Sequence, residues 1–146
     1  MGGARRGFSL VEALVAVALL GILVLVAVPR LTTPESVQVG VPARHLAADL
    51  RLAQRLAIAR RATYTLEFSP AAPPYAAYVV RREGAGAEPD FPKTFAAGVT
   101  VTGPPQFTFR PDGSADGDGT VTLSSDGVVA TLQVTAATGR VVVTAP

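Results

Sequence analysis

The strongest pattern in the chain is an uninterrupted apolar run near the N-terminus. Residues 8–28 contain a single charged side chain, Glu12. As a helix, this run would span roughly 30 Å, which is enough to cross the hydrocarbon core of a membrane. Because Arg5 and Arg6 precede the run, the positive-inside rule predicts a cytoplasmic N-terminus and export of everything that follows the helix.

A second helical pattern, with a period near 3.6 residues, covers residues 43–62. Its apolar face is formed by Leu46, Leu50, Ala53 and Ala57. The basic residues Arg44, Arg51 and Arg55 fall on nearly the opposite face. This pattern predicts an amphipathic helix with one face in a core and a basic face in solvent or against an acidic partner.

The segment between the two helical patterns, residues 30–42, contains three residues that are unfavourable inside a helix: Pro34, Gly40 and Pro42. We therefore expect a kinked or extended connector between a first helix at residues 8–29 and an exported domain at residues 43–146.

From residue 63 onward the pattern changes to short alternating runs that are separated by Gly and Pro, as in antiparallel strands. The predicted strands are residues 63–68, 76–82, 99–102, 107–110, 120–124, 129–135 and 141–144. The last two flank a hairpin turn in which Gly139 can adopt a positive φ. Residues 81–93 are predicted to form an exposed loop. The fold class is therefore α+β, with the amphipathic helix (43–62) packed on an antiparallel β-region (63–146).

Composition excludes several classes of function. The chain of 146 residues has no Cys, one His and a net charge of +2, which rules out disulfides, thiolate metal sites and cysteine catalysis. No nucleotide-binding loop, nucleophile elbow or pair of catalytic carboxylates is evident. We expect no enzyme activity, no cofactor, no metal site and no small-molecule substrate.

Two weaker constellations deserve a structural test. Residues 112–118 alternate oxygen-bearing side chains like the start of a calcium loop, but Leu123 stands where the closing Glu would be. We expect an acidic turn there instead. His45 and Asp49 are one helical turn apart and could touch, but without a nucleophile nearby in sequence we expect His45 to be an exposed or hydrogen-bonded helix residue.

The N-terminal run admits three kinds of export signal. An ordinary secretory signal has a shorter apolar region and a small-residue cleavage site, which residues 26–29 match poorly. A twin-arginine signal fits Arg5 and Arg6 but leaves Glu12 without a role. A carboxylate in an apolar helix costs about 2.5–3.5 kcal/mol on insertion, so it is expected to be functional and to have a partner.

The sequence from Gly7 to Glu12 closely resembles the processing site of type IV pilins and the related pseudopilins. This resemblance implies that residues 1–7 are a leader, that a prepilin peptidase cuts between Gly7 and Phe8, and that Phe8 is then N-methylated. It also implies that residues 8–29 are the transmembrane and assembly helix, with a helix-softening kink at Pro29. Glu12 becomes the fifth mature residue, whose carboxylate can pair with the Phe8 amine of a neighbouring subunit.

The rest of the chain resembles one branch of this family, the H-type minor pseudopilins of type II secretion and the FimT-like minor pilins. Three short motifs carry the resemblance: Leu46 to Arg60, Phe109 to Gly113, and Thr138-Gly139-Arg140. They imply a pilin-like fold and a structural role in a secretion pseudopilus or type IV pilus-like filament. The implied partners are the prepilin peptidase, other pilins and the membrane, with single-pass insertion in the inner membrane before transfer to a filament.

Two alternatives remain open from the sequence. Some FimT-like proteins bind DNA during natural transformation through a C-terminal Gly-Arg-x-Arg turn. This chain has Arg140 but Val142 in place of the second Arg, so its candidate DNA contacts are Arg140 and the helix face of Arg44, Arg51 and Arg55. The other alternative is a membrane-anchored domain that never assembles.

Overall fold

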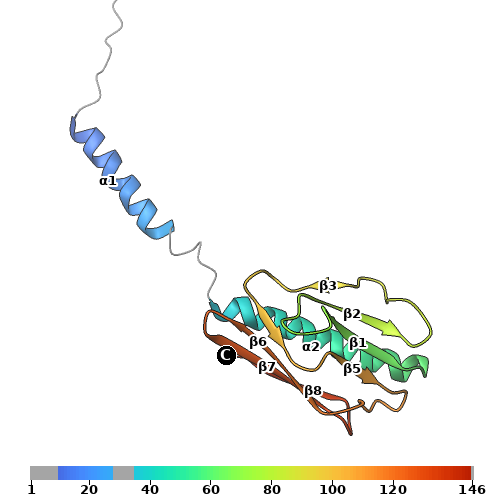
Figure 1. Cartoon of the computed structure of the whole chain (residues 1–146). Coiled ribbons are helices and arrows are strands. Elements are labelled where there is room, and N and C mark those ends of the chain that lie inside the picture. Colours follow the sequence, from blue (N-terminus) through green and yellow to red (C-terminus); the bar gives the residue numbers. More distant parts are fainter. Residues whose placement is uncertain (1–9, 28–34, 146) are drawn as a thin grey trace, which may run out of the picture. The chain divides into compact units, whose positions relative to one another are not determined.

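The computed structural model describes residues 10–27 and 35–145. The chain divides into two units, Met1–Thr33 and Pro34–Pro146. In its described residues, the first unit holds helix α1 (Leu10–Ala27), and the second holds helix α2 (Glu35–Arg60) followed by eight strands (Figure 1).

Helix α1 carries one acidic residue in its first turn, Glu12. The side chains of residues 10–20 are all exposed. Within the described part of the chain, no helix meets the combined length and hydropathy that a membrane crossing requires.

The strands form two antiparallel four-stranded sheets. Their bounds are β1 Tyr64–Ser69, β2 Ala77–Arg82, β3 Lys93–Thr94, β4 Thr100–Thr102, β5 Gln106–Phe109, β6 Gly119–Ser125, β7 Val128–Thr135 and β8 Arg140–Thr144. The first sheet has the order β3-β2-β1-β5 and the second the order β4-β6-β7-β8. Each predicted strand is confirmed to within one residue at each end. The two-residue strand β3 was not predicted, because it is too short to show alternation.

Alternation of apolar and polar residues determines which face of each strand is buried. In β1, Tyr64, Leu66 and Phe68 are buried, whereas the residues between them point outward. Leu66 lies opposite Val80 of β2 and Phe107 of β5. These side chains therefore share one face of the first sheet and form a continuous apolar layer.

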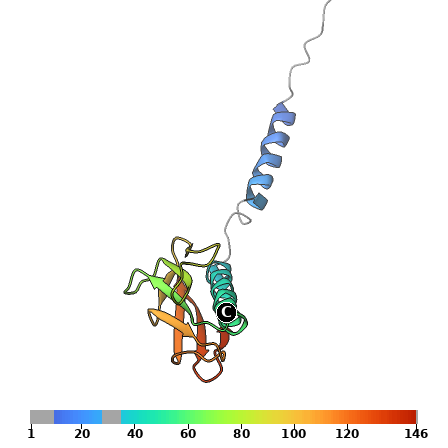
Figure 2. The same cartoon turned by 90° about the vertical axis from the view of Figure 1, so that its right-hand side faces the viewer.

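Helix α2 covers this apolar layer and the inner face of the second sheet. The predicted face of Leu46, Leu50, Ala53 and Ala57 is completely buried. The helix contacts β1 and β5 of one sheet and β6, β7 and β8 of the other, and Figure 2 shows it standing beside the strands. Small Ala side chains let the helix approach the strands closely, so one helix closes the core of both sheets.

The predicted connector at residues 30–42 is wrong for its second part, because α2 begins at Glu35 and includes Pro42. Pro42 removes one helical hydrogen bond and costs about 3 kcal/mol in a helix interior. Val39 and Ala43 are nevertheless fully buried against the domain. Burial of a Val side chain alone contributes about 1.5–3 kcal/mol, which accounts for most of what the helix loses at Pro42. Residues 30–34 of the predicted connector lie outside the described residues.

The C-terminal end of α2 is a reversed turn. Arg61 has a φ of 48°, and the N–H of Ala62 donates to the carbonyl of Ala57 at 3.2 Å. This six-to-one bond with a left-handed residue is the Schellman arrangement, which satisfies a free carbonyl at the helix end. The chain thereby turns back into β1.

The loop predicted at residues 81–93 is exposed for most of its length, but its predicted ends are wrong, because Arg81 and Arg82 belong to β2 and Lys93 belongs to β3. Glu88 fastens the part between these strands. The N–H of Glu88 donates to Val80, and its side chain accepts from Arg60 at 2.7 Å and from the Tyr64 hydroxyl at 3.0 Å. This loop is therefore tied to the end of α2 and to β1.

The early start of α2 gives a first prediction. Val39→Asp should lower the free energy of unfolding by about 3 kcal/mol or more, because it buries a carboxylate in the core. Val41→Asp is the matched control, since Val41 is 42% exposed, and should change stability by only about 0.5 kcal/mol. Urea denaturation of the full chain in detergent measures both. Equal effects of the two substitutions would contradict the packing of this helix turn against the domain.

Candidate functional site

Of the residues predicted to direct processing and assembly, the structure describes Glu12. It lies in the first turn of α1 and its side chain is exposed. Gly7, Phe8 and Pro29 lie outside the described residues. Cleavage, N-methylation and the helix kink at these positions stay predictions.

Three of the four arginines predicted to contact DNA lie together. Arg44 and Arg51 on α2 and Arg140 at the start of β8 line an open groove of about 740 Å³. The remaining lining residues are Ala47, Gln54, Thr138, Val141, Val142 and Val143. Among the described residues that line it, the groove therefore has three cationic side chains and no acidic one, so this surface is positive.

The four arginines are not equivalent. The Arg51 guanidinium donates to the carbonyl of Val141 at 2.9 Å and so connects α2 to β8. Arg55 does not line the groove, and its Nε donates to the carbonyl of Arg51 at 3.3 Å. Arg44 and Arg140 are exposed, so their head groups can reach a ligand.

The side chain of Gln54 joins segments that are far apart in the sequence. Its Nε2 donates to the carbonyl of Gly113 at 2.7 Å and to the carbonyl of Thr138 at 2.8 Å. Gln54, Gly113 and Thr138 belong to the three motifs that relate this chain to the H-type branch. The motifs therefore meet at one point, where α2 contacts both the turn after β5 and the β7–β8 hairpin.

Gly139 is required by this close approach. Its φ is 59°, and a Cβ atom there would lie 2.3 Å from the Gly113 carbonyl oxygen and 2.4 Å from Gln54 Nε2. Gly139 was predicted from its turn position, but the role of Gln54 was not predicted. No local pattern distinguishes an amide that binds two distant carbonyls from one that faces solvent.

A buried carboxylate connects α2 to the first sheet. Asp49 accepts a hydrogen bond from the Tyr78 hydroxyl at 2.7 Å, and Lys93 Nζ lies 2.8 Å and 2.9 Å from its two oxygens. Burial, and then the hydrogen bond to Asp49, raises the pKa of Tyr78, so the phenol stays protonated as a donor. Lys93 also lies 4.8 Å from the centre of the Phe91 ring.

His45 and Asp49, one helical turn apart, were expected to be close enough to touch. His45 is exposed, as expected, and the partners of the Asp49 carboxylate are Tyr78 and Lys93. The cluster fastens α2 to β2 and β3. These contacts tie the helix to the first sheet.

The acidic turn at residues 112–118 uses its carboxylates within the protein. Asp112 accepts from the backbone N–H and hydroxyl of Ser114, which lowers the pKa of Asp112. Asp116 pairs with Arg110, and Asp118 accepts from the N–H of Ala136 at 2.6 Å. Among the described residues, no group of three or more His or carboxylate side chains is placed to hold a metal ion.

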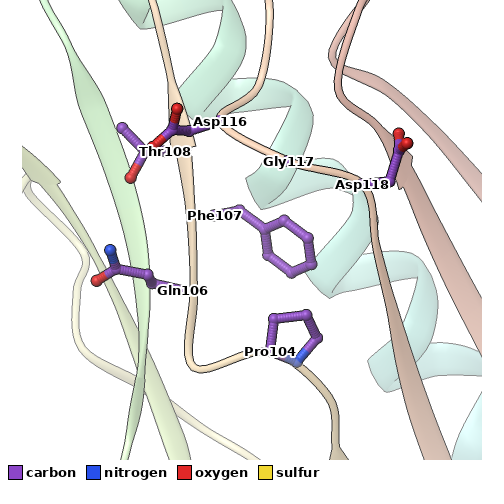
Figure 3. A pocket seen from close by; sticks show the side chains of 7 residues that line it. All are labelled: Pro104, Gln106, Phe107, Thr108, Asp116, Gly117 and Asp118. Carbon is purple, nitrogen blue, oxygen red and sulfur yellow. The ribbon is translucent and has the colours of Figure 1, made fainter.

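Figure 3 shows how two carboxylates of this turn lie. Asp116 and Asp118 lie on either side of Gly117, at opposite ends of a small hollow of about 160 Å³. The ring of Phe107 and the side chain of Pro104 lie between β5 and this segment. Gln106 and Thr108 add polar side chains to the lining of the hollow.

Two family models match this chain. The model described as type II transport protein GspH matches residues 43–139, and the prokaryotic N-terminal methylation motif matches residues 3–28. The chain therefore belongs to the GspH family of type II transport proteins and carries an N-terminal methylation motif. A search among curated protein sequences returned no significant match.

Solved structures share the fold. The type IV minor pilin FimU of Pseudomonas aeruginosa superposes with a TM-score of 0.62 at 19% identity, over 74% of this chain and 92% of FimU. The minor pseudopilin EpsH from the type 2 secretion system of Vibrio cholerae gives a TM-score of 0.61 at 13% identity, over 75% of this chain and 98% of EpsH. The predicted pilin-like α+β fold is confirmed.

The meeting of the three motifs gives a second prediction. Gly139→Ala should lower the free energy of unfolding by about 3 kcal/mol, because it combines backbone strain at positive φ with a steric overlap. Gly127→Ala is the matched control. Gly127 has a φ of 84° and nothing within 4 Å of an added Cβ, so only the strain of about 1–2 kcal/mol applies.

Urea denaturation of the two full-length variants separates these contributions. If Gly139→Ala lowers the free energy of unfolding no more than Gly127→Ala does, the contact between the three motifs does not depend on the close approach of the backbone at Gly139.

Proposed function

We propose that this chain is a minor structural subunit of a type II secretion pseudopilus or of a type IV pilus-like filament. The observation that carries the proposal is the presence in one chain of an N-terminal methylation motif and a GspH domain with the minor-pilin fold. In this function the first unit anchors and assembles the subunit, and the second is displayed on the filament.

The proposed life cycle follows from the charges at the N-terminus. The precursor spans the inner membrane once through residues 8–29, with Arg5 and Arg6 on the cytoplasmic side. Cleavage after Gly7 removes these arginines and creates a cationic amine on Phe8. Glu12 can then pair with the amine of a neighbouring subunit. Breaking one side of such a pair in an apolar bundle costs about 3–5 kcal/mol, so the pair fixes the register between subunits.

Processing gives a third prediction. Co-expression with a prepilin peptidase should reduce the intact mass by the first seven residues and add one methyl group. Gly7→Ala should slow or block the cut, and Gly3→Ala, in the same leader but away from the cut, should be processed normally. An unchanged mass of the unaltered chain, with the peptidase shown to cut another prepilin, would contradict the proposal.

Assembly gives a fourth prediction. Glu12→Ala should be cleaved normally but incorporated into sheared filaments at about one hundredth of the normal amount, because one charge of the pair is lost. The measurement is the ratio of this subunit to the main pilin in the filament fraction. Glu83→Ala, which removes an exposed carboxylate in the other unit, is the control. Normal incorporation of Glu12→Ala would exclude the ion pair as the registration device.

The second candidate function is that of a DNA receptor in the natural-transformation machinery. One observation favours it, namely that Arg44, Arg51 and Arg140 line one groove. Two observations weaken it, since the Arg51 head group is already bonded to Val141 and Val142 replaces the second arginine of the DNA-binding turn.

A binding assay tests this candidate directly. For a DNA receptor, the full chain in detergent should bind a 20-base-pair duplex with an affinity that falls with salt. Arg140→Ala should reduce the slope of this salt dependence by nearly one unit. Arg82→Ala, which removes an exposed arginine outside the groove, controls for net charge. Equal binding by both variants would count against DNA recognition at Arg140.

A further inference from the structure

Strand β8 leaves one backbone edge of the second sheet open. It is the last strand in the order β4-β6-β7-β8. The Val141 carbonyl accepts from Arg51 and therefore points away from β7. Because successive residues of a strand point their backbone groups to alternate sides, the N–H and carbonyl of Val143 point to the same open side as those of Val141.

Two other outer strands, β5 and β4, already carry backbone hydrogen bonds on their outer sides. On β5, Thr108 accepts from the N–H of Asp116, and Phe109 pairs with Ala115. On β4, the Val101 carbonyl accepts from the N–H of Tyr75. On β8, the outward Val141 carbonyl is bonded by the side chain of Arg51, which can turn away. Of these three described edges, β8 is therefore the one best placed to pair with another chain.

The groove beside this edge defines the chemistry of such a chain. Arg44 and Arg51 lie on its α2 side and Arg140 at the start of β8, and none of the lining residues that the structure describes is acidic. Val142 is 39% exposed on the strand itself. An extended segment with carboxylate side chains would satisfy both the backbone edge and the arginines. Duplex DNA would satisfy only the arginines.

A second copy of this chain is a poor occupant. Two β8 edges that pair with each other would bring two sets of the same three arginines together, and like charges in close contact are unfavourable. The arginines therefore prevent self-pairing at the edge and select an acidic partner.

We propose that the β8 edge and the arginine groove bind an extended acidic segment of another protein by strand addition. In the free protein, Arg51 covers the Val141 carbonyl. On binding, a backbone N–H of the partner takes this carbonyl, and Arg51 turns to a carboxylate of the same segment. This inference goes beyond the filament assignment, which would stand if it failed.

The test uses a fluorescein-labelled nine-residue peptide in which glutamate and valine alternate, and fluorescence anisotropy with the full chain in detergent. We expect saturable binding. It should weaken about tenfold in Arg140→Glu and about tenfold in Arg44→Glu, since each reverses a charge that faces the peptide. Arg82→Glu makes the same charge change outside the groove and should bind within about twofold of the unaltered protein.

Two further variants test the backbone pairing. The first is the same peptide with three N-methylated amides, placed so that both of its backbone edges are affected. It keeps its charge but loses backbone N–H donors, so it should bind at least about tenfold more weakly. The second is Val143→Pro, which removes the backbone N–H that points to the open side of β8 and leaves the hydrogen bonds between β8 and β7 in place. It should also weaken binding, because the partner strand loses one donor. A thermal melt of Val143→Pro confirms that the domain stays folded. If the melt shows unfolding, the N-methylated peptide alone decides.

Several results would overturn the proposal. They are an absence of saturable binding, equal binding of the N-methylated peptide, and an equal loss in Arg82→Glu. Tighter binding of a 20-base-pair duplex that displaces the peptide would assign the groove to DNA instead.

Discussion

The fold depends on the burial of one face of α2 against both sheets. Each sheet has one apolar face, and α2 packs against strands of both sheets. Leu46, Leu50, Ala53 and Ala57 fill the space between the helix and the strands and are fully buried. This packing joins the helix and both sheets in one hydrophobic core. It also explains why the helix continues back through Pro42 to bury Val39, since apolar burial offsets the hydrogen bond that proline removes.

The polar contacts of α2 fix where the helix lies on this core. Asp49 fastens it to Tyr78 and Lys93 of the first sheet, Arg51 to the carbonyl of Val141 in the second, and Gln54 to two turns between them. These bonds have directions, unlike the apolar contacts, so they select one rotation and one translation of the helix. The arginine groove is a consequence of that placement, because it lies along the line where α2 passes the open edge of β8.

The proposed functions divide between the two units of the chain. The first unit carries the marks of processing and assembly, and its one acidic residue, Glu12, lies on an exposed helix. The second unit is a compact domain whose described surface offers a positive groove and an open strand edge. A filament subunit needs both kinds of surface, since the first joins it to its neighbours and the second gives it a distinct partner.

The sequence by itself determined what depends on local order: the apolar run with Glu12, the amphipathic face of α2 and the alternation of the strands. It also supplied Gly139, because a turn position requires its conformation. Tertiary structure alone decided that α2 starts at Glu35 and that Arg55 leaves the groove that Arg44, Arg51 and Arg140 share. It also decided that Gln54 binds carbonyls 59 and 84 positions away. The physical reason is that periodicity reports which face of an element is buried, whereas contacts between distant residues depend on how whole elements pack.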